Sequence, residues 1–325
     1  MPVVVTGSIA TDHLMTFPGK FAEQFVEGQM ENVSLSFLVD DLVQHRGGAG
    51  ANMAYGMGLL GLRPVLVGAV GGDFADYDAW LVRHGVDTSS VHWSEIRHTA
   101  RFVCTTDAAN NQIASFYSGA MSEAADIELA PVASRVGEPD LVVVGPNDPT
   151  AMVRHTEECR ERGYRFAADP SQQLAWADGE MIRSLVHGAE LLFTNEYEAA
   201  LLCQKTGWTT DEVLDRVGVW VTTRSANGIL VRRAGEEPIE VIAVPETKPV
   251  EPTGGGDALR AGFIAGLTWG LGLERATQLG SAVATEAVEV VGTQEYGLDR
   301  EPFLLRFAEA FGQDAADDVA AHLPA

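Results

Sequence analysis

The sequence predicts an α/β fold of the three-layer αβα kind, with a mostly parallel central sheet and a small β-sheet lid. Short apolar runs rich in β-branched residues recur along the 325 residues, and most are separated by amphipathic helical patterns. Continuous apolar strands that alternate with helices are typical of a parallel sheet covered on both faces. Residues 14–46 and 92–119 break this alternation, and we expect them to form a lid on a single domain spanning residues 1–325.

The strands of the central sheet are predicted at six buried runs, residues 3–6, 65–67, 141–144, 166–168, 191–193 and 219–222. Helices are predicted between several of them and after the last, including residues 52–60, 151–162, 196–205 and 258–267. Within the lid, segments 99–106 and 112–117 flank a polar turn, which predicts an antiparallel hairpin. The Ala/Asp-rich tail from Gln313 is expected to be a frayed helix.

The composition excludes several classes of function. The formal charge is −24, and lysine occurs only at positions 20, 205 and 248. Such an acidic chain is a poor partner for nucleic acid or anionic lipid, so we expect neither nucleic-acid nor membrane binding. The three widely spaced cysteines fit neither a disulfide framework nor a metal site. No signal peptide or membrane-length apolar run is recognised, so we expect a cytoplasmic protein.

Segment 251–263 carries the clearest chemical signal. Gly254, Gly255 and Gly256 run directly into Asp257 and then into a helical pattern. Glycines leave the backbone amides uncovered and a helix N-terminus adds a positive dipole, so the segment predicts an anion cradle. A carboxylate is useful there if it takes a proton from a hydroxyl that attacks a bound phosphate. The structural alternative is a glycine turn with Asp257 as an ordinary helix N-cap.

A second glycine cluster, residues 46–54, also opens a predicted helix and carries Asn52. Asp12 follows the first strand, where Gly7 and Ser8 let the chain turn. The amide of Asn52 offers both a donor and an acceptor, and a carboxylate accepts two hydroxyl protons, so the pair could hold a vicinal diol. Taken alone, an aspartate at the position of Asp12 is more often a loop residue or a helix cap than a ligand-binding residue.

Asn195 and Glu198 follow the strand at 191–194. Three residues apart on a first helical turn, they face the same side. They could carry water-coordinated Mg²⁺ beside a phosphate. The spacing also fits a capping box, with Asn195 at the N-cap and Glu198 at the third helical position.

These motifs, in this order, resemble those of the ribokinase-like (phosphofructokinase-B type) small-molecule kinases. The family signature is matched by the Gly-Gly…Asn cluster, by Asn-x-x-Glu and by Thr253-Gly254-Gly255-Gly256-Asp257. The resemblance spans nearly the whole chain. Segments 6–15, 33–42, 167–174 and 292–295 look like the adenosine kinases of mycobacteria and related actinobacteria.

The resemblance implies a role for each matching position. The nucleoside-binding positions are matched by Ser8, Asp12, Ser36, Gly48, Asn52, Phe102, Phe116, Gln172 and Gln173. Phe102 and Phe116, on the two strands of the predicted hairpin, match aromatic residues that stack on adenine; without the family match, hydrophobic packing would be the default. The ATP-binding side is matched by Asn195, Thr223 and Gly228, and the water-mediated Mg²⁺ position by Glu198.

The activity implied by the resemblance is ATP-dependent phosphorylation of the adenosine 5′-hydroxyl, giving AMP and ADP. Activation by K⁺ is common in the family, and Glu251 and residues 292–294 would be its neighbourhood here. The chain departs from the family at Gly255, where a small residue or Val is usual, and at Ser225, where relatives tend to have Gly. The second departure bears on the preference for the phosphoryl donor.

Two alternatives remain at this point. A sugar kinase acting on ribose or fructose would keep Asp12, Asn52 and Asp257 but would not need the two phenylalanines. A catalytically inactive nucleoside-binding regulatory protein could use the same fold. Exposed strands of the lid could also pair across a two-fold axis and form a homodimer.

Overall fold

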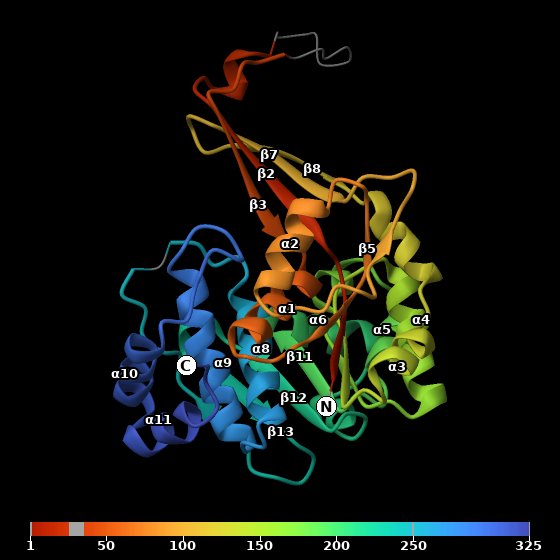
Figure 1. Ribbon diagram of the computed structural model, residues 1–325, viewed down its shortest axis with the longest axis vertical. Helices are drawn as coiled ribbons and strands as arrows, with labels where there is room; N and C mark the ends of the chain where they lie inside the picture. Colours follow the sequence, from red (N-terminus) through yellow and green to blue (C-terminus); the bar gives the residue numbers. More distant parts are fainter. Residues whose placement is uncertain (1, 26–35, 249, 325) are drawn as a thin grey trace.

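The structure, a computed structural model, describes residues 2–25, 36–248 and 250–324 and has a large sheet with helices on both faces (Figure 1). Eight strands run in the order β14-β13-β12-β11-β10-β9-β1-β4. Their bounds are β1 Val3–Thr6, β4 Val65–Val67, β9 Leu141–Val144, β10 Phe166–Ala168, β11 Leu191–Asn195, β12 Val219–Thr223, β13 Ile229–Arg232 and β14 Ile239–Val241. The strands from β4 to β12 pair in parallel, whereas β13 and β14 add antiparallel strands at one edge. The predicted mostly parallel sheet is confirmed.

Alternate residues of each central strand pack against different helix layers, which explains the continuous apolar runs of the sequence. Val3 and Val5 pack with residues of α1, α8 and α9, whereas Val4 packs with residues of α3, α4, α5 and α6. The helices of the first layer are α1 Ala49–Leu59, α8 Gly255–Thr268 and α9 Leu273–Val288. Those of the second are α3 Leu129–Val136, α4 Pro149–Arg162, α5 Gly179–Val186 and α6 Glu196–Thr206.

The lid is a separate four-stranded sheet that extends from the main body (Figure 1). Its strands, in spatial order, are β3 Asp41–Gly47, β2 Ala10–Phe17, β7 Ala100–Asp107 and β8 Gln112–Tyr117. The predicted hairpin is present as β7 and β8, but β2 also lies parallel to β7, and β3 pairs antiparallel with β2. The sequence pattern does not predict β2 and β3, because most of their residues are partly or fully exposed and form no continuous apolar run.

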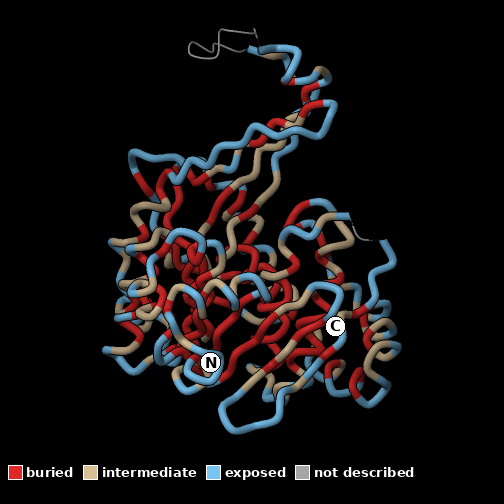
Figure 2. The backbone as a smooth tube through the Cα atoms, turned by 180° about the vertical axis from the view of Figure 1, so that it is seen from behind, coloured by how far each residue is buried: buried red, intermediate tan, exposed pale blue. Residues whose placement is uncertain are grey.

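The remaining elements surround this framework. They include β5 Ala69–Val70, β6 His92–Trp93, α2 Ala75–Arg83, α7 Thr210–Leu214, α10 Arg300–Phe311 and α11 Gln313–Ala320. The tail forms a helix from Gln313, as predicted, but it is not frayed, because Ala315, Ala316 and Val319 of α11 are buried in a core cluster. Buried backbone is concentrated in the main body, whereas much of the lid is exposed or intermediate (Figure 2). Of the helices that the structure describes, none has the length and apolar character needed to cross a membrane.

Candidate active site

A cavity of about 820 Å³ lies at the carboxyl ends of the parallel strands, between the start of α8 and the lid. This is the edge at which open α/β sheets bind ligands. The predicted residues that line it are Ser8, Asp12, Gly48, Asn52, Phe116, Gln172, Gln173, Asn195, Glu198, Thr223, Gly254, Gly256 and Asp257. Residues that are far apart in the sequence are therefore brought to one place.

A second cavity, of about 490 Å³, has a largely apolar lining that includes Val244 and Val288. Gly228 and Gly255 line this second cavity rather than the first. The two cavities share Thr223, Ser225 and Gly256. They consequently meet at the glycine segment that opens α8.

The start of α8 has the geometry of an anion site. Gly254 is the N-cap in a left-handed conformation, with φ 85°. The amide of Gly255 donates to the carbonyl of Pro252 at 3.3 Å. Within the described part of the chain, the amides of Gly256 and Asp257 have no acceptor, as is normal for a first helical turn. Those two amides are free to bind an anion in the cavity.

Asp257 lies in the first turn of α8, so the alternative that it is the N-cap is wrong. Its Oδ2 accepts a hydrogen bond from Nδ2 of Asn52 at 2.9 Å. Burial raises the pKa of the Asp257 carboxyl, while the charge of Arg260 and the hydrogen bond from Asn52 oppose that rise. The carboxylate is thus held beside the free amides with a higher affinity for protons than an exposed aspartate.

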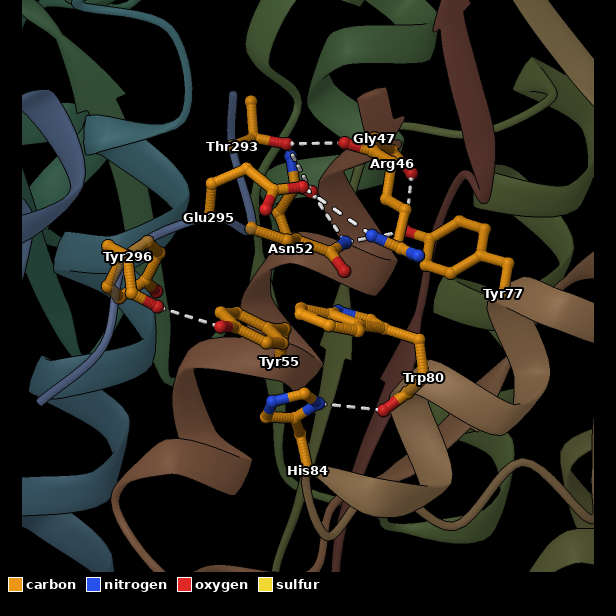
Figure 3. Close-up of polar contacts among 11 residues, drawn as sticks. Arg46, Gly47, Asn52, Tyr55, Tyr77, Trp80, His84, Thr293, Glu295 and Tyr296 are labelled. Carbon is orange, nitrogen blue, oxygen red and sulfur yellow. Dashed lines mark hydrogen bonds and ion pairs between the residues drawn. The ribbon is translucent and has the colours of Figure 1, made fainter. Parts of the chain in front are cut away.

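Asn52 is held by an extended hydrogen-bond network (Figure 3). Its Oδ1 accepts from Oγ1 of Thr293 and from Nε2 of Gln294, both at 2.9 Å. Nε2 of Gln294 also contacts the hydroxyl of Tyr77 at 2.5 Å, and that hydroxyl donates to the carbonyl of Gly47 at 2.9 Å. Both sides of the Asn52 amide are therefore engaged by protein groups. The structure connects Asn52 with Asp257, whereas the sequence analysis paired it with Asp12 on a diol.

Asp12 lies on β2 with its carboxylate against Gly47, where an added Cβ would be 2.8 Å from Oδ2. Among the described residues, none donates a hydrogen bond to this carboxylate, so it can accept from a ligand. Burial raises its pKa, and His45 opposes that shift. The hydroxyl of Ser8 accepts from the amide of Ala49 at 3.0 Å, at the start of α1. Gly48, with φ 94°, fits there because an added Cβ would lie 2.5 Å from the Ser8 carbonyl oxygen.

The lid presents Phe102 and Phe116 on the same face as Asp12. Phe102 pairs with Asp12 on β2 and with Phe116 on β8, and directly paired residues point to one face of a sheet. Phe116 lines the large cavity, whereas Phe102 and the exposed Ser36 do not. Both phenylalanine rings are solvent-accessible, at 36% and 54%. Packing under the hairpin therefore does not explain them.

The two predicted glutamines differ in their surroundings. Gln172 is exposed, and its Oε1 accepts from the hydroxyl of Ser171. Gln173 is buried and donates from Nε2 to the carbonyl of Asn147 at 2.8 Å. Its Oε1 is buried without a partner in the described structure.

Asn195 and Glu198 form the capping box that was the structural alternative. The side chain of Asn195 accepts from the amide of Glu198 at 2.7 Å, and Glu198 accepts from the amide of Asn195 at 2.8 Å. Both side chains also line the cavity, so the cap places a carboxylate there. Thr223 is the register partner of Asn195 on the neighbouring strand. Within the described ranges, no cluster of three His, Cys, Asp or Glu side chains is arranged to hold a metal ion directly.

Two charged residues of the site were missed by the sequence analysis. Arg260 lines the cavity from α8 and forms an ion pair with Asp169, which follows β10. Two signals could have indicated them. Arg260 lies one helical turn after Asp257, and Asp169 stands at the carboxyl end of a buried strand.

The chain is similar to known kinases in sequence and in fold. The family model for pfkB family carbohydrate kinases matches residues 8–300. A nucleoside kinase from Methanothermobacter thermautotrophicus is 32% identical over 271 residues, covering 82% of this chain and 86% of that protein. The nucleoside kinase of Burkholderia thailandensis in complex with inosine is 34% identical, with a TM-score of 0.82 over 96% of this chain and 98% of that one. The nucleoside kinase of Methanocaldococcus jannaschii, an archaeal member of the ribokinase family, is 25% identical, with a TM-score of 0.82 over 95% and 98% of the two chains.

Proposed function

Because the chain belongs to the pfkB family of carbohydrate kinases and has the ribokinase-like fold, we propose that it is an adenosine kinase. It transfers the γ-phosphoryl group of ATP to the 5′-hydroxyl of adenosine and gives AMP and ADP, a purine salvage reaction. A nucleoside acceptor is supported by the nucleoside kinases among its relatives, one of which was solved with inosine. The identity of the base is the finer part of the proposal.

The observation that carries the proposal is the junction of the two cavities at the start of α8. A phosphoryl donor in the apolar second cavity would bring its terminal phosphate to Gly256, which both cavities share. The free amides of Gly256 and Asp257 stabilise the charge on the transferring oxygens, and the amide of Gly254 borders the same space. The carboxylate of Asp257 faces the acceptor from the same helical turn.

The acceptor is held on the lid side of the large cavity. Asp12 accepts hydrogen bonds from the ribose hydroxyls, with Ser8 and Gly48 beside it. Phe102 and Phe116 contact the base, and each such stack contributes about 1–3 kcal/mol. Gln172 and Gln173 approach the base, and Ser36 reaches the site from the lid. A sugar kinase would leave the two exposed rings without a purpose.

The donor side uses Asn195, Thr223 and Gly228. Glu198 fits a water-mediated Mg²⁺ site because it offers a carboxylate oxygen to the cavity, and Mg²⁺ keeps several of its waters. Bound Mg²⁺ neutralises charge on the phosphate oxygens. K⁺ would bind near Glu251, whose carboxylate accepts the amide of Gly292 at 3.0 Å. That contact joins the segment before Gly254 to the segment that holds Thr293.

For phosphoryl transfer, the protein must position the two substrates and stabilise the charge on the transferring phosphate. Asn52 fixes the direction of the Asp257 carboxylate. The 5′-hydroxyl attacks the γ-phosphorus while Asp257 accepts its proton, and ADP leaves with the electrons of the broken P–O bond. A lid closed over the cavity excludes water and limits hydrolysis of ATP.

The test is an acceptor panel of adenosine, inosine, guanosine, ribose and fructose with MgATP, run with and without K⁺, with ADP release as the measurement. We expect the highest kcat/KM with adenosine and low values with both sugars. A preference for ribose or fructose would contradict the nucleoside assignment. Adenosine binding without ADP release would support a catalytically inactive binding protein instead.

A further inference from the structure

A buried ion pair stands directly beside the base. Nη2 of Arg260 donates to Oδ1 of Asp169 at 2.7 Å, and the two side chains are 9% and 1% exposed. Asp169 follows β10, and Arg260 lies on α8 one turn after Asp257. An added Cβ on Gly256 would be 2.7 Å from Nη1 of Arg260. The missing side chain at Gly256 therefore leaves room for the guanidinium next to the anion site.

Stability does not account for this pair. Taking two charges out of water costs several kcal/mol per ion, and apolar residues of similar volume are often at least as stable. Arg260 is the only Lys or Arg among the described residues that line the large cavity. The other charged groups of the lining are all acidic: Asp12, Asp148, Glu198 and Asp257. The net charge of the chain is −24, so Arg260 provides positive charge at a place where the other charged side chains are acidic.

We infer that the Asp169–Arg260 pair keeps Asp257 ionised as the base, because Asp169 holds the guanidinium charge of Arg260 one helical turn from it. The inference rests on the proposed phosphoryl transfer. Oδ2 of Asp169 and Nε of Arg260 are buried without a partner in the described structure. Arg260 lies one turn after Asp257 on the same helix, so its charge acts on the Asp257 carboxylate. Arg260 supplies the attraction, and Asp169 holds the guanidinium and moderates its charge.

Other polar and titratable groups near Asp257 affect its ionisation or that of the Asp169–Arg260 pair. Asn52, from α1, donates to the carboxylate. Glu198, from α6, interacts unfavourably with Asp169 and favourably with Arg260. Burial raises the pKa of both Tyr77 and Tyr296, so these neighbours stay neutral. Arg260 is thus the cation that opposes the effect of burial on the pKa of Asp257.

Replacing Arg260 and replacing Asp169 should shift the pH dependence of kcat in opposite directions. A base works only when it is deprotonated, so the acid limb of the kcat profile follows the pKa of Asp257. Arg260→Met removes the opposing cation, and the acid limb should move to higher pH by about one unit or more. Asp169→Asn removes a negative charge near Asp257 and no longer offsets the positive charge of Arg260. The pKa of Asp257 should fall, so the acid limb should move to lower pH. Arg260→Lys keeps the charge and should restore most of the wild-type profile.

The experiment measures kcat for adenosine phosphorylation against pH for the wild type and these three variants. Arg306→Met is the matched control, because Arg306 also forms ion pairs, with Glu286 and Glu289, but does not line the cavity. Its profile should match the wild type. If Arg260→Met does not fold, the near-isosteric Asp169→Asn decides alone. Unmoved acid limbs in folded variants of an active enzyme would overturn the inference.

Failure of the proposed function has a different signature. A wild-type protein that releases no ADP with any nucleoside would contradict the proposed function but would not contradict the effect of the ion pair on Asp257. In that case, ¹³C NMR titration of the Asp257 carboxyl in the same variants decides the inference, with the same expected directions. Equal pKa values in all variants would overturn it.

Discussion

At the scale of single residues, Asn52 joins the start of α1 to the Asp257 carboxylate on α8. It donates to Asp257 and accepts from Thr293 and Gln294. The sequence predicted a base at Asp257, because glycine clusters that open helices are typical of anion sites, and it predicted that Asn52 holds a diol with Asp12. It did not predict that the side chains of Asn52 and Asp257 bond to each other, because 205 positions separate them in the sequence. Local spacing holds no information about such a contact.

Replacing Asn52 with Ala should lower kcat by about 10–100-fold, because a hydrogen bond to a charged group is worth roughly 1.5–3 kcal/mol. It should also raise the pKa of Asp257, since one of the two opposing contacts is lost. Steady-state kinetics across pH measures both effects. Thr293→Val is the comparison, because it removes one donor to Asn52 and leaves the bond to Asp257; it should reduce kcat less. Equal losses in the two variants would contradict a direct role for Asn52.

At the scale of elements, both glycine-opened helices begin three residues earlier than predicted. α1 starts at Ala49 rather than 52, and α8 at Gly255 rather than 258. Glycine has poor helix propensity, so sequence reasoning placed the glycines outside the helices. In the structure, Gly50, Gly255 and Gly256 lie in the first helical turns, whereas Gly48 and Gly254 are the N-caps. An added Cβ at Gly50 would lie 2.7 Å from Cα of Gly7, so the backbone approaches a neighbouring segment closely there. The element types followed from periodicity, whereas the boundaries depended on tertiary contacts.

Gly48→Ala should destabilise the protein more than an ordinary left-handed glycine replacement. The change forces a side chain into a positive φ and against the Ser8 carbonyl, at 2.5 Å. Gly312, with φ 92° and ψ 160° and open space around its Cβ position, is the control, because its replacement by Ala strains a similar backbone without a close contact. Thermal unfolding should show a clearly larger loss for Gly48→Ala. Equal shifts would mean that the close approach to Ser8 carries no energetic weight.

The lid strands give a second prediction at this scale. Replacing Phe102 and Phe116 together with Ala should raise the KM for adenosine by about tenfold or more, because base stacking is lost. The weak activity with ribose should change little. Tyr117→Ala is the control, since Tyr117 is the next residue on β8 and points to the other face of the sheet. Equal losses for adenosine and ribose would mean that the rings only hold the lid.

At the scale of the whole molecule, β3 and β8 are the edges of the lid sheet, and neither edge pairs with a further strand of the described ranges. All six residues of β8 are exposed, and so are Leu42 and Val43 on β3. An exposed edge with apolar residues is a template for pairing with another chain. The fold class and the order of the motifs could be predicted from the sequence. The parallel pairing of β2 with β7 could not, because it depends on contacts between segments about 90 residues apart.

We expect a homodimer that forms through the lid, measured by light scattering after size-exclusion chromatography. Leu42→Glu with Val43→Glu should shift the protein to the monomer, because the charges disfavour pairing at the β3 edge. Leu305→Glu, at an exposed position of α10, should leave the dimer intact. A wild-type protein that elutes with the mass of one chain at all concentrations would exclude this assembly.

The turnover of Asp257→Asn tests the central claim most directly. The substitution keeps the shape of the side chain and removes its ability to accept the 5′-hydroxyl proton. At saturating adenosine and MgATP, we expect kcat to fall by about 10²–10⁴-fold, while calorimetry shows adenosine affinity within a few-fold of the wild type. A folded variant with near wild-type turnover would contradict the assignment of Asp257 as the base.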